Sequence, residues 1–320
     1  MQIGIFRALC LEPQIGTLSK KMTTIIRLII ITTLYASSIN AKGMRPLAPP
    51  SEPAEPPNIG LFSLPSSQQP GPLISFGQTL VDKNNLQWLT IPTYLQETNH
   101  NSEFMVISTF VYGLTDSIAL SLNVPYYVLN KIDLNHSSGV SDVGLNAEFG
   151  FFSASNSSYT TQATVLSTIT LPSGSFDADP SLGLGALSYF IGTTFNRDYL
   201  NWWWFVSPGV TWISPHHDMH DGTVYFFQGG IGQHISSSAN HYIFSGLLEF
   251  DGAYEGKAKI AGIDDPESGG YNILITPSLN YSAKNWQIQG GVSFPLLQQW
   301  NGDQPNINYL ATVCFTLTLN

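Results

Sequence analysis

Imidazole and carboxylate side chains crowd into one short segment, SPHHDMHDG (214–222). Imidazole nitrogens and carboxylate oxygens are ligands that suit Zn²⁺, Ni²⁺ or Cu²⁺. The candidate metal ligands are His216, His217 and His220, with Asp218 and Asp221 beside them. The segment lies between two strand-like runs, where no helix would fix the geometry of the ligands. We therefore favour adventitious metal binding over a dedicated centre, and we predict no cofactor.

A second group of candidate residues is spaced by two. In DVGLNAEFGFF (142–152), the polar or small residues Asp142, Gly144, Asn146 and Glu148 alternate with apolar ones. Successive side chains of a strand point to opposite faces of a sheet, so this run predicts a strand. One face of that strand would be apolar, and the other would carry two carboxylates and an amide.

The composition indicates which kind of sheet has two such faces. Only 11% of the 320 residues are charged, whereas 43% are hydrophobic and 12% are aromatic. A soluble domain has about 25% charged residues, so this chain has too few charges to coat a soluble surface of its size. No apolar run is long enough to predict a bundle of spanning helices. We therefore predict an all-β, antiparallel transmembrane barrel, whose apolar residues face lipid and whose polar residues face the lumen.

Strand-like runs and turn clusters alternate from residue 85 to the end of the chain. Short and long connections also alternate, as periplasmic turns and extracellular loops do in bacterial barrels, which have even strand numbers. Trp202, Trp203 and Trp204 lie at a predicted strand end and would belong to an aromatic girdle at the membrane interface. The chain thus predicts 12 strands, near residues 85–97, 102–112, 117–128, 141–152, 158–171, 182–192, 201–213, 222–235, 240–253, 269–281, 285–295 and 307–320.

The polar phase of these strands supplies the candidate lumen residues. They are Asp142, Asn146, Glu148, Glu249, Asp251, Gln287 and Gln289. Carboxylates in a narrow lumen could favour the passage of cations or neutral solutes. Alternatively, these groups only form hydrogen bonds with polar neighbours across a filled lumen. The sequence favours neither alternative.

The N-terminal region predicts export. Residues 1–41 read as a secretory signal peptide, with Lys20, Lys21 and Arg27 before an apolar core and a cleavage site near Ala41. Residues 1–21 precede Met22, which would itself start a conventional signal. Residues 42–72 are rich in proline and predict a disordered tail. Residues 73–84 predict either an additional strand or a plug, and residues 85–320 the barrel.

Cysteines and net charge restrict the partners. Cys10 precedes the predicted cleavage site, so Cys314 has no intrachain disulfide partner in the mature chain. The formal net charge of −10 makes nucleic acid an unsuitable partner. The predicted partners are outer-membrane lipid, a small-molecule solute and the machinery that assembles barrels.

One part of the chain resembles a known family. Tyr112–Asp116 (YGLTD), the pair Pro125 and Tyr126, and Ser141–Gly144 (SDVG) are similar to motifs of the outer-membrane barrels associated with the meta-pathway of phenol degradation. TLPSG (170–174) also fits that pattern. The resemblance is specific around residues 112–174 and implies a barrel that passes small hydrophobic or aromatic molecules. It brings no catalytic residues, and the terminal Asn320 departs from the aromatic residue with which many such barrels end.

These observations predict a channel of the bacterial outer membrane and not an enzyme. The first alternative is a barrel that hydrolyses lipids, because His234 and His241 flank a turn that contains Ser236–Ser238. The second is a closed barrel with a structural or surface-interaction role. A soluble two-sheet sandwich would show the same alternation, but a polar face of Thr, Ser, Asn, Gln and Gly makes a poor solvated surface.

Overall fold

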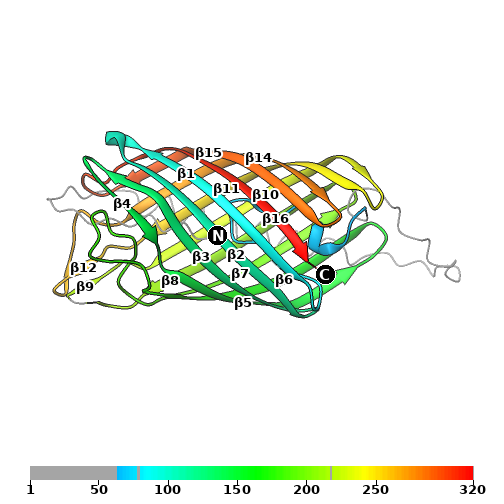
Figure 1. The fold of residues 1–320 in the computed structure, drawn as a ribbon, viewed down its shortest axis with the longest axis horizontal. Coiled ribbons are helices and arrows are strands. Elements are labelled where there is room, and N and C mark those ends of the chain that lie inside the picture. The colour runs from blue at the N-terminus through cyan, green and yellow to red at the C-terminus, as the bar shows by residue number, and fades with distance from the viewer. Residues whose placement is uncertain (1–62, 78–79, 217, 320) are drawn as a thin grey trace, which may run out of the picture. The chain divides into compact units, whose positions relative to one another are not determined.

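A computed structural model describes residues 63–77, 80–216 and 218–319, so the predicted signal peptide (1–41) and residues 42–62 of the predicted tail lie outside the described residues. Within these ranges, 12 antiparallel strands form one closed barrel (Figure 1). β1 pairs with β2 on one side and with β16 on the other, which closes the ring. The predicted 12-stranded barrel is confirmed. Its strands are β1 (Leu86–Glu97), β2 (Ser102–Thr115), β3 (Ile118–Ile132), β5 (Val143–Ser155), β6 (Tyr159–Leu171), β7 (Ser188–Tyr199), β8 (Trp202–Ile213), β10 (Val224–Ser238), β11 (Tyr242–Glu255), β14 (Gly270–Ala283), β15 (Trp286–Trp300) and β16 (Ile307–Leu319).

The two ends of the barrel differ in their connections. At the short-turn end, hairpins such as β2–β3 and β7–β8 turn through only two or three residues, and β1 begins and β16 ends there. At the opposite, long-loop end, the larger connections are 133–142, 172–187, 214–223 and 256–269. Short turns are typical of the periplasmic side of bacterial barrels and longer loops of the extracellular side. In the described part of the chain, no helix is long and apolar enough to cross a membrane.

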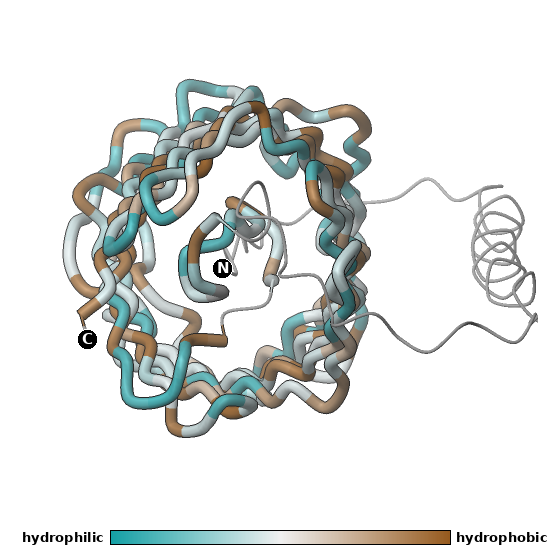
Figure 2. The backbone as a smooth tube through the Cα atoms, turned by 90° about the vertical axis from the view of Figure 1, so that its right-hand side faces the viewer, coloured by the Kyte–Doolittle hydropathy of each residue, from teal (hydrophilic) through white to brown (hydrophobic). Residues whose placement is uncertain are grey.

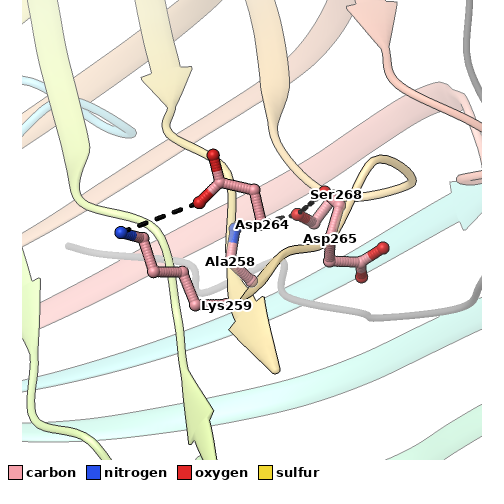
Figure 3. A network of polar contacts seen from close by, with 5 residues as sticks. All are labelled: Ala258, Lys259, Asp264, Asp265 and Ser268. Carbon is pink, nitrogen blue, oxygen red and sulfur yellow. Dashed lines mark hydrogen bonds and ion pairs between the residues drawn. The ribbon is translucent and has the colours of Figure 1, made fainter. Parts of the chain in front are cut away.

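The long-loop end carries additional structure. β4 (Asn135–Val140) extends the wall beside β3, while β9 (Met219–His220), β12 (Lys259–Ile260) and β13 (Ile263–Asp264) form a small separate sheet. Figure 3 shows the ion pair between Lys259 Nζ and Asp264 Oδ1, 3.7 Å apart, and a network in which Ala258 N donates to Ser268 Oγ. Because both ends of the ion pair are exposed, it contributes about 1 kcal/mol or less. The backbone pairing of β9 with β12 also joins loops 214–223 and 256–269.

The largest difference between predicted and observed strand boundaries concerns β7. The sequence predicts a strand over 182–192 and the next over 201–213, which makes TTFNRDYL (193–200) their connection, whereas β7 spans Ser188–Tyr199. The polar residues misled the prediction, because Thr194 lies on the inward face of the strand and the exposed Phe195 on the outward face. Polar residues in the lumen phase thus continue a strand and do not end it.

The predicted arrangement, with apolar side chains on the outside and polar ones on the inside, is present throughout the barrel. Large apolar side chains on its outside are exposed, among them Leu145, Phe149, Phe227, Leu279 and Phe294, whereas inward polar residues such as Thr276, Ser293 and Thr316 are fully buried. Figure 2 looks along the barrel and shows the wall as a ring, with part of the chain lying inside it. Apolar side chains outward and polar ones inward suit a wall between lipid and a lumen.

Trp203 departs from the predicted girdle. It is 3% exposed and points inward, where its ring stacks on His234 at 4.8 Å, while Trp202 is exposed on the outside. A Cβ atom on Gly232 would lie 2.2 Å from the Trp203 ring, so only glycine leaves room for the indole. Consecutive residues of a strand face opposite ways, so three adjacent tryptophans cannot all face lipid.

Candidate functional site

A segment that precedes the first strand lies in the lumen. The backbone N–H groups of Leu73, Ile74 and Ser75 donate hydrogen bonds to the side chain of Glu249, at 2.8, 3.2 and 3.0 Å. Glu249 lies on β11 and is fully buried. Three consecutive N–H groups of a non-strand segment would be orphaned inside a barrel without such an acceptor. Glu249 therefore anchors the segment to the wall.

Two further polar side chains of the wall hold the same segment. Ser75 Oγ donates to Asp251 Oδ1, and Phe76 N donates to Gln228 Oε1 at 2.9 Å. Gln228 and Asp251 are register partners on β10 and β11. The segment is thus bound across two adjacent strands through both backbone and side-chain donors.

Phe76 packs against an aromatic side chain of the wall. Its ring meets the Phe190 ring edge-on, with centroids 4.8 Å apart, and only 3% of the residue is exposed. A Cβ atom on Gly192 would lie 2.6 Å from the Phe76 ring, and one on Gly209 would lie 2.8 Å from it. The wall therefore lacks side chains at the place where Phe76 is seated. Edge-to-face aromatic pairs add about 0.5–1.5 kcal/mol beyond the area that they bury.

The part of the segment before Leu73 is ordered by the wall as well. Gln68 Nε2 donates to Thr318 Oγ1, Gln87 Nε2 donates to Ser67 O at 2.7 Å, and Asn240 N donates to Ser63 O at 2.8 Å. Composition predicts disorder over 42–72, and from residue 63 onward the structure differs. The prolines prevent a core of the segment's own, yet polar side chains of the barrel supply the hydrogen bonds.

Residues 73–84, predicted as a strand or a plug, belong to no strand in the positions that the structure describes. Val81 packs against Val111 and Ala119, which carries the chain along the inner wall toward β1. Residues 63–77 are called the lumen segment below.

Asn146, Glu148, Gln287 and Gln289 also lie on the inner wall, and the three amides donate hydrogen bonds to hydroxyl groups of neighbouring strands. Asn146 Nδ2 donates to Ser121 Oγ at 2.8 Å, and Gln289 Nε2 donates to Ser278 Oγ at 3.1 Å. Gln287 Nε2 donates to Thr316 Oγ1 at 3.3 Å, and Glu148 is 2% exposed. Their role in ion selectivity stays a prediction. Sequence reasoning missed Gln228, although its place in the polar phase of β10 was a signal for it.

Asp142 does not contact the lumen segment. It lies at the long-loop end, where its carboxylate accepts hydrogen bonds from Gly174 N at 2.9 Å and Leu184 N at 2.7 Å. Both donors belong to loop 172–187, so Asp142 fastens this loop to the base of β5. Burial raises the pKa of Asp142 above its ordinary value, and the bonds from Leu184 and Gly174 oppose this rise only in part.

The pKa of Asp142 predicts that loop 172–187 loosens as the pH rises. A carboxyl group whose pKa is raised by folding stabilises the folded loop below its ordinary pKa of about 4, and this contribution is lost as the pH passes its raised pKa. Hydrogen exchange of amides 172–187 should therefore increase with pH beyond the intrinsic rate, measured against the β10–β11 turn. Asp142→Asn should abolish this dependence. An unchanged dependence in that variant would contradict the assignment.

The histidine loop has no metal geometry in the described residues. His216 is backbone-paired with Met219, and its ring meets Phe176 edge-on at 4.9 Å. No group of three or more His, Cys, Asp or Glu within the described ranges is arranged to hold a metal ion. His217 lies outside those ranges, so metal binding by His216, His217 and His220 stays a prediction.

His234 and Ser236 of the predicted hydrolytic turn have different partners. His234 points into the lumen, where its Nδ1 lies 3.0 Å from Ser245 Oγ, and Ser245 is 1% exposed. Ser236 Oγ instead lies 3.0 Å from the Tyr242 hydroxyl. The histidine of this turn is thus paired with a buried serine of β11.

Comparisons with known proteins identify the fold. No family model and no curated protein matches the sequence. An outer membrane channel from Pseudomonas putida F1 has a similar structure, with a TM-score of 0.61 at 16% sequence identity, over 75% of this chain and 97% of that chain. The NanC porin gives a TM-score of 0.48 at 11% identity over 72% and 100% of the two chains. The CymD monoaromatic hydrocarbon channel gives 0.36 at 10% identity over 74% and 89%. At these identities the likeness concerns the fold, which is that of an outer-membrane β-barrel.

Proposed function

We propose that the protein is a channel of the bacterial outer membrane that passes small hydrophobic or aromatic molecules. The observation that carries this proposal is the polar lumen of a closed barrel with an apolar outside, narrowed by a segment of the chain itself. A 12-stranded barrel is narrow enough for lumen side chains to constrict it. Selective passage of small solutes suits this arrangement better than a wide, water-filled pore.

The proposed solute class rests on aromatic side chains inside the lumen. Phe76, Phe190 and Phe226 form a chain of edge-on contacts, with centroids 4.8 and 6.1 Å apart. Phe76 and Phe190 are each 3% exposed while the lumen segment is docked, so their faces become available to a flat apolar solute when the segment leaves the wall. The motifs Tyr112–Asp116 and Ser141–Gly144 support the same class, because they resemble barrels associated with the meta-pathway of phenol degradation.

Two rival classes fit the geometry less well. A hydrolase needs a nucleophile that its substrate can reach, and both members of the His234–Ser245 pair are buried. A permanently closed structural barrel would suit the occupied lumen, but it gives no reason for a segment whose described residues pair with no strand of the wall. A segment held by side-chain hydrogen bonds and by the packing of Leu73, Ile74 and Phe76 on the wall can be released without unfolding a strand.

Liposome swelling tests the proposed channel and its solute class. Proteoliposomes in iso-osmotic benzoate should swell several times faster than protein-free liposomes, whereas a disaccharide should give no difference. Phenol should follow benzoate after correction for its own passage through lipid. Equal rates with and without protein for every solute would contradict a channel, and rapid sugar uptake would contradict the solute class.

A further inference from the structure

A single arginine lies on the lipid-facing side of the barrel near its short-turn end. Arg197 is on β7, two residues before the strand ends at Tyr199, and it is the only arginine after residue 45. The preceding outward residue, Phe195, is 44% exposed. Strands rise about 3.3 Å per residue, so Arg197 lies roughly 6–7 Å beyond that phenyl group along the outward face. Arg197 is therefore farther from the apolar band than Phe195 and closer to the depth of the lipid headgroups.

The guanidinium group of Arg197 is held through its Nε atom and its flat face, whereas its two terminal nitrogens are free within the described part of the chain. Arg197 Nε donates to Thr161 Oγ1 at 2.8 Å, and Cζ lies 4.7 Å from the centroid of the Tyr159 ring. Within the residues that the structure describes, its two terminal nitrogens have neither a hydrogen-bond nor an ion-pair partner. A fixed, planar fork of N–H donors suits bidentate binding of a phosphate.

Aromatic residues with polar tips surround this cation. Tyr199 stacks on Trp202 with centroids 4.4 Å apart, and it lies 5.9 Å from Tyr159. Trp204 is the register partner of Arg197 on β8. Tyrosine and tryptophan are enriched where the hydrocarbon of a bilayer meets its headgroups. Tyr159, Tyr199, Trp202 and Trp204 are called the aromatic belt below. The belt places the free N–H groups of Arg197 at the level of lipid phosphates.

We propose that Arg197, together with Tyr159, Thr161 and the stacked pair Tyr199–Trp202, binds the phosphate of a phospholipid headgroup. The charge is complementary, since an isolated cation on an otherwise acidic chain faces the anionic part of the lipid. The site lies in the leaflet at the short-turn end, which is the periplasmic side in barrels of this type. It is independent of the lumen and of any solute that passes through it.

Native mass spectrometry of the full-length barrel in a maltoside detergent, which carries no phosphate, tests this site. Titration with phosphatidylglycerol should show one phospholipid bound more tightly than the rest. Arg197→Gln should weaken this first binding step roughly fivefold, as expected for the loss of one cation near lipid phosphates. Arg197→Lys should give an intermediate affinity, because it keeps the charge and loses the fork.

Lys284→Gln is the matched control. Lys284 is exposed on the β14–β15 turn at the same end, so this variant removes an equal charge away from the belt. The affinity of Lys284→Gln for the first phospholipid should stay that of the wild type. Equal affinity in Arg197→Gln and wild type, or equal losses in Arg197→Gln and Lys284→Gln, would overturn the proposal. Displacement of the lipid by millimolar inorganic phosphate would assign the site to the free ion instead. If Arg197→Gln does not fold, Tyr159→Leu is measured in its place. An unchanged affinity of that variant for the first phospholipid would equally overturn the proposal.

Discussion

Replacing Glu249 by glutamine is expected to raise the single-channel conductance of the barrel severalfold. Two oxygens of Glu249 accept three backbone N–H groups of the lumen segment. Glutamine keeps the size of the side chain but turns one of these oxygens into a donor, which then faces an N–H group. A hydrogen bond to a charged group contributes about 1.5–3 kcal/mol. Its loss should shift the ratio of docked to released segment roughly tenfold or more.

Planar-bilayer recordings measure this effect, and Glu148→Gln is the control. That variant removes a carboxyl group from the inner wall on β5, whereas the bonds from Leu73, Ile74 and Ser75 to Glu249 stay. We expect the conductance of Glu148→Gln to stay close to that of the wild type. An equal rise in both variants would mean that lumen charge sets the conductance and that release of the segment does not.

The same recordings decide the second predicted role of the carboxylates. If Glu148 and Glu249 select ions, the reversal potential in a salt gradient should move toward zero in both glutamine variants, because each removes a site that favours cations. Unchanged reversal potentials would leave Glu249 as an anchor of the lumen segment. The geometry favours that outcome for Glu249, because both of its oxygens are already occupied.

The barrel itself could be predicted from the sequence because lipid and lumen impose opposite demands on adjacent residues. In β14, Asn272, Thr276 and Ser278 are buried on the inner face while Leu279 is exposed on the outer face, as the alternation predicts. The error in β7 has the same origin. Thr194 resembled a turn residue by type, and only its phase within the strand shows that it belongs to the wall.

The lumen segment could not be predicted in this way. Leu73 and Glu249 are 176 positions apart, and the segment has no alternation that would assign it a face. A carboxylate that points into a lumen is equally compatible with water, a solute or a piece of the chain. Gly192 and Gly209 carry the strongest hint, since glycine within a strand often marks a place where another group approaches closely. Which group approaches them follows only from the fold.

Phe76→Ala is expected to release the lumen segment while the barrel stays intact. Removal of a buried phenylalanine costs about 3–5 kcal/mol in a protein core. Phe76 lies outside every strand, and its ring contacts Phe190 above Gly192 and Gly209. The cost should therefore fall on the docking of the segment and not on the pairing of the strands. A loss of 3 kcal/mol would raise the released fraction roughly a hundredfold.

Two measurements distinguish release of the lumen segment from loss of strand pairing. Hydrogen exchange at Leu73–Ser75 should quicken strongly in Phe76→Ala, because their N–H groups lose Glu249 when the segment leaves the wall. The melting temperature of the strands should change by no more than in Phe227→Ala, which removes an exposed ring from the outside of β10. Protected amides at Leu73–Ser75 would show that the hydrogen bonds to Glu249 and Gln228 hold the segment without Phe76. A barrel that melts much earlier would instead make the lumen segment a structural core of the fold, and a releasable constriction of the lumen would then be excluded.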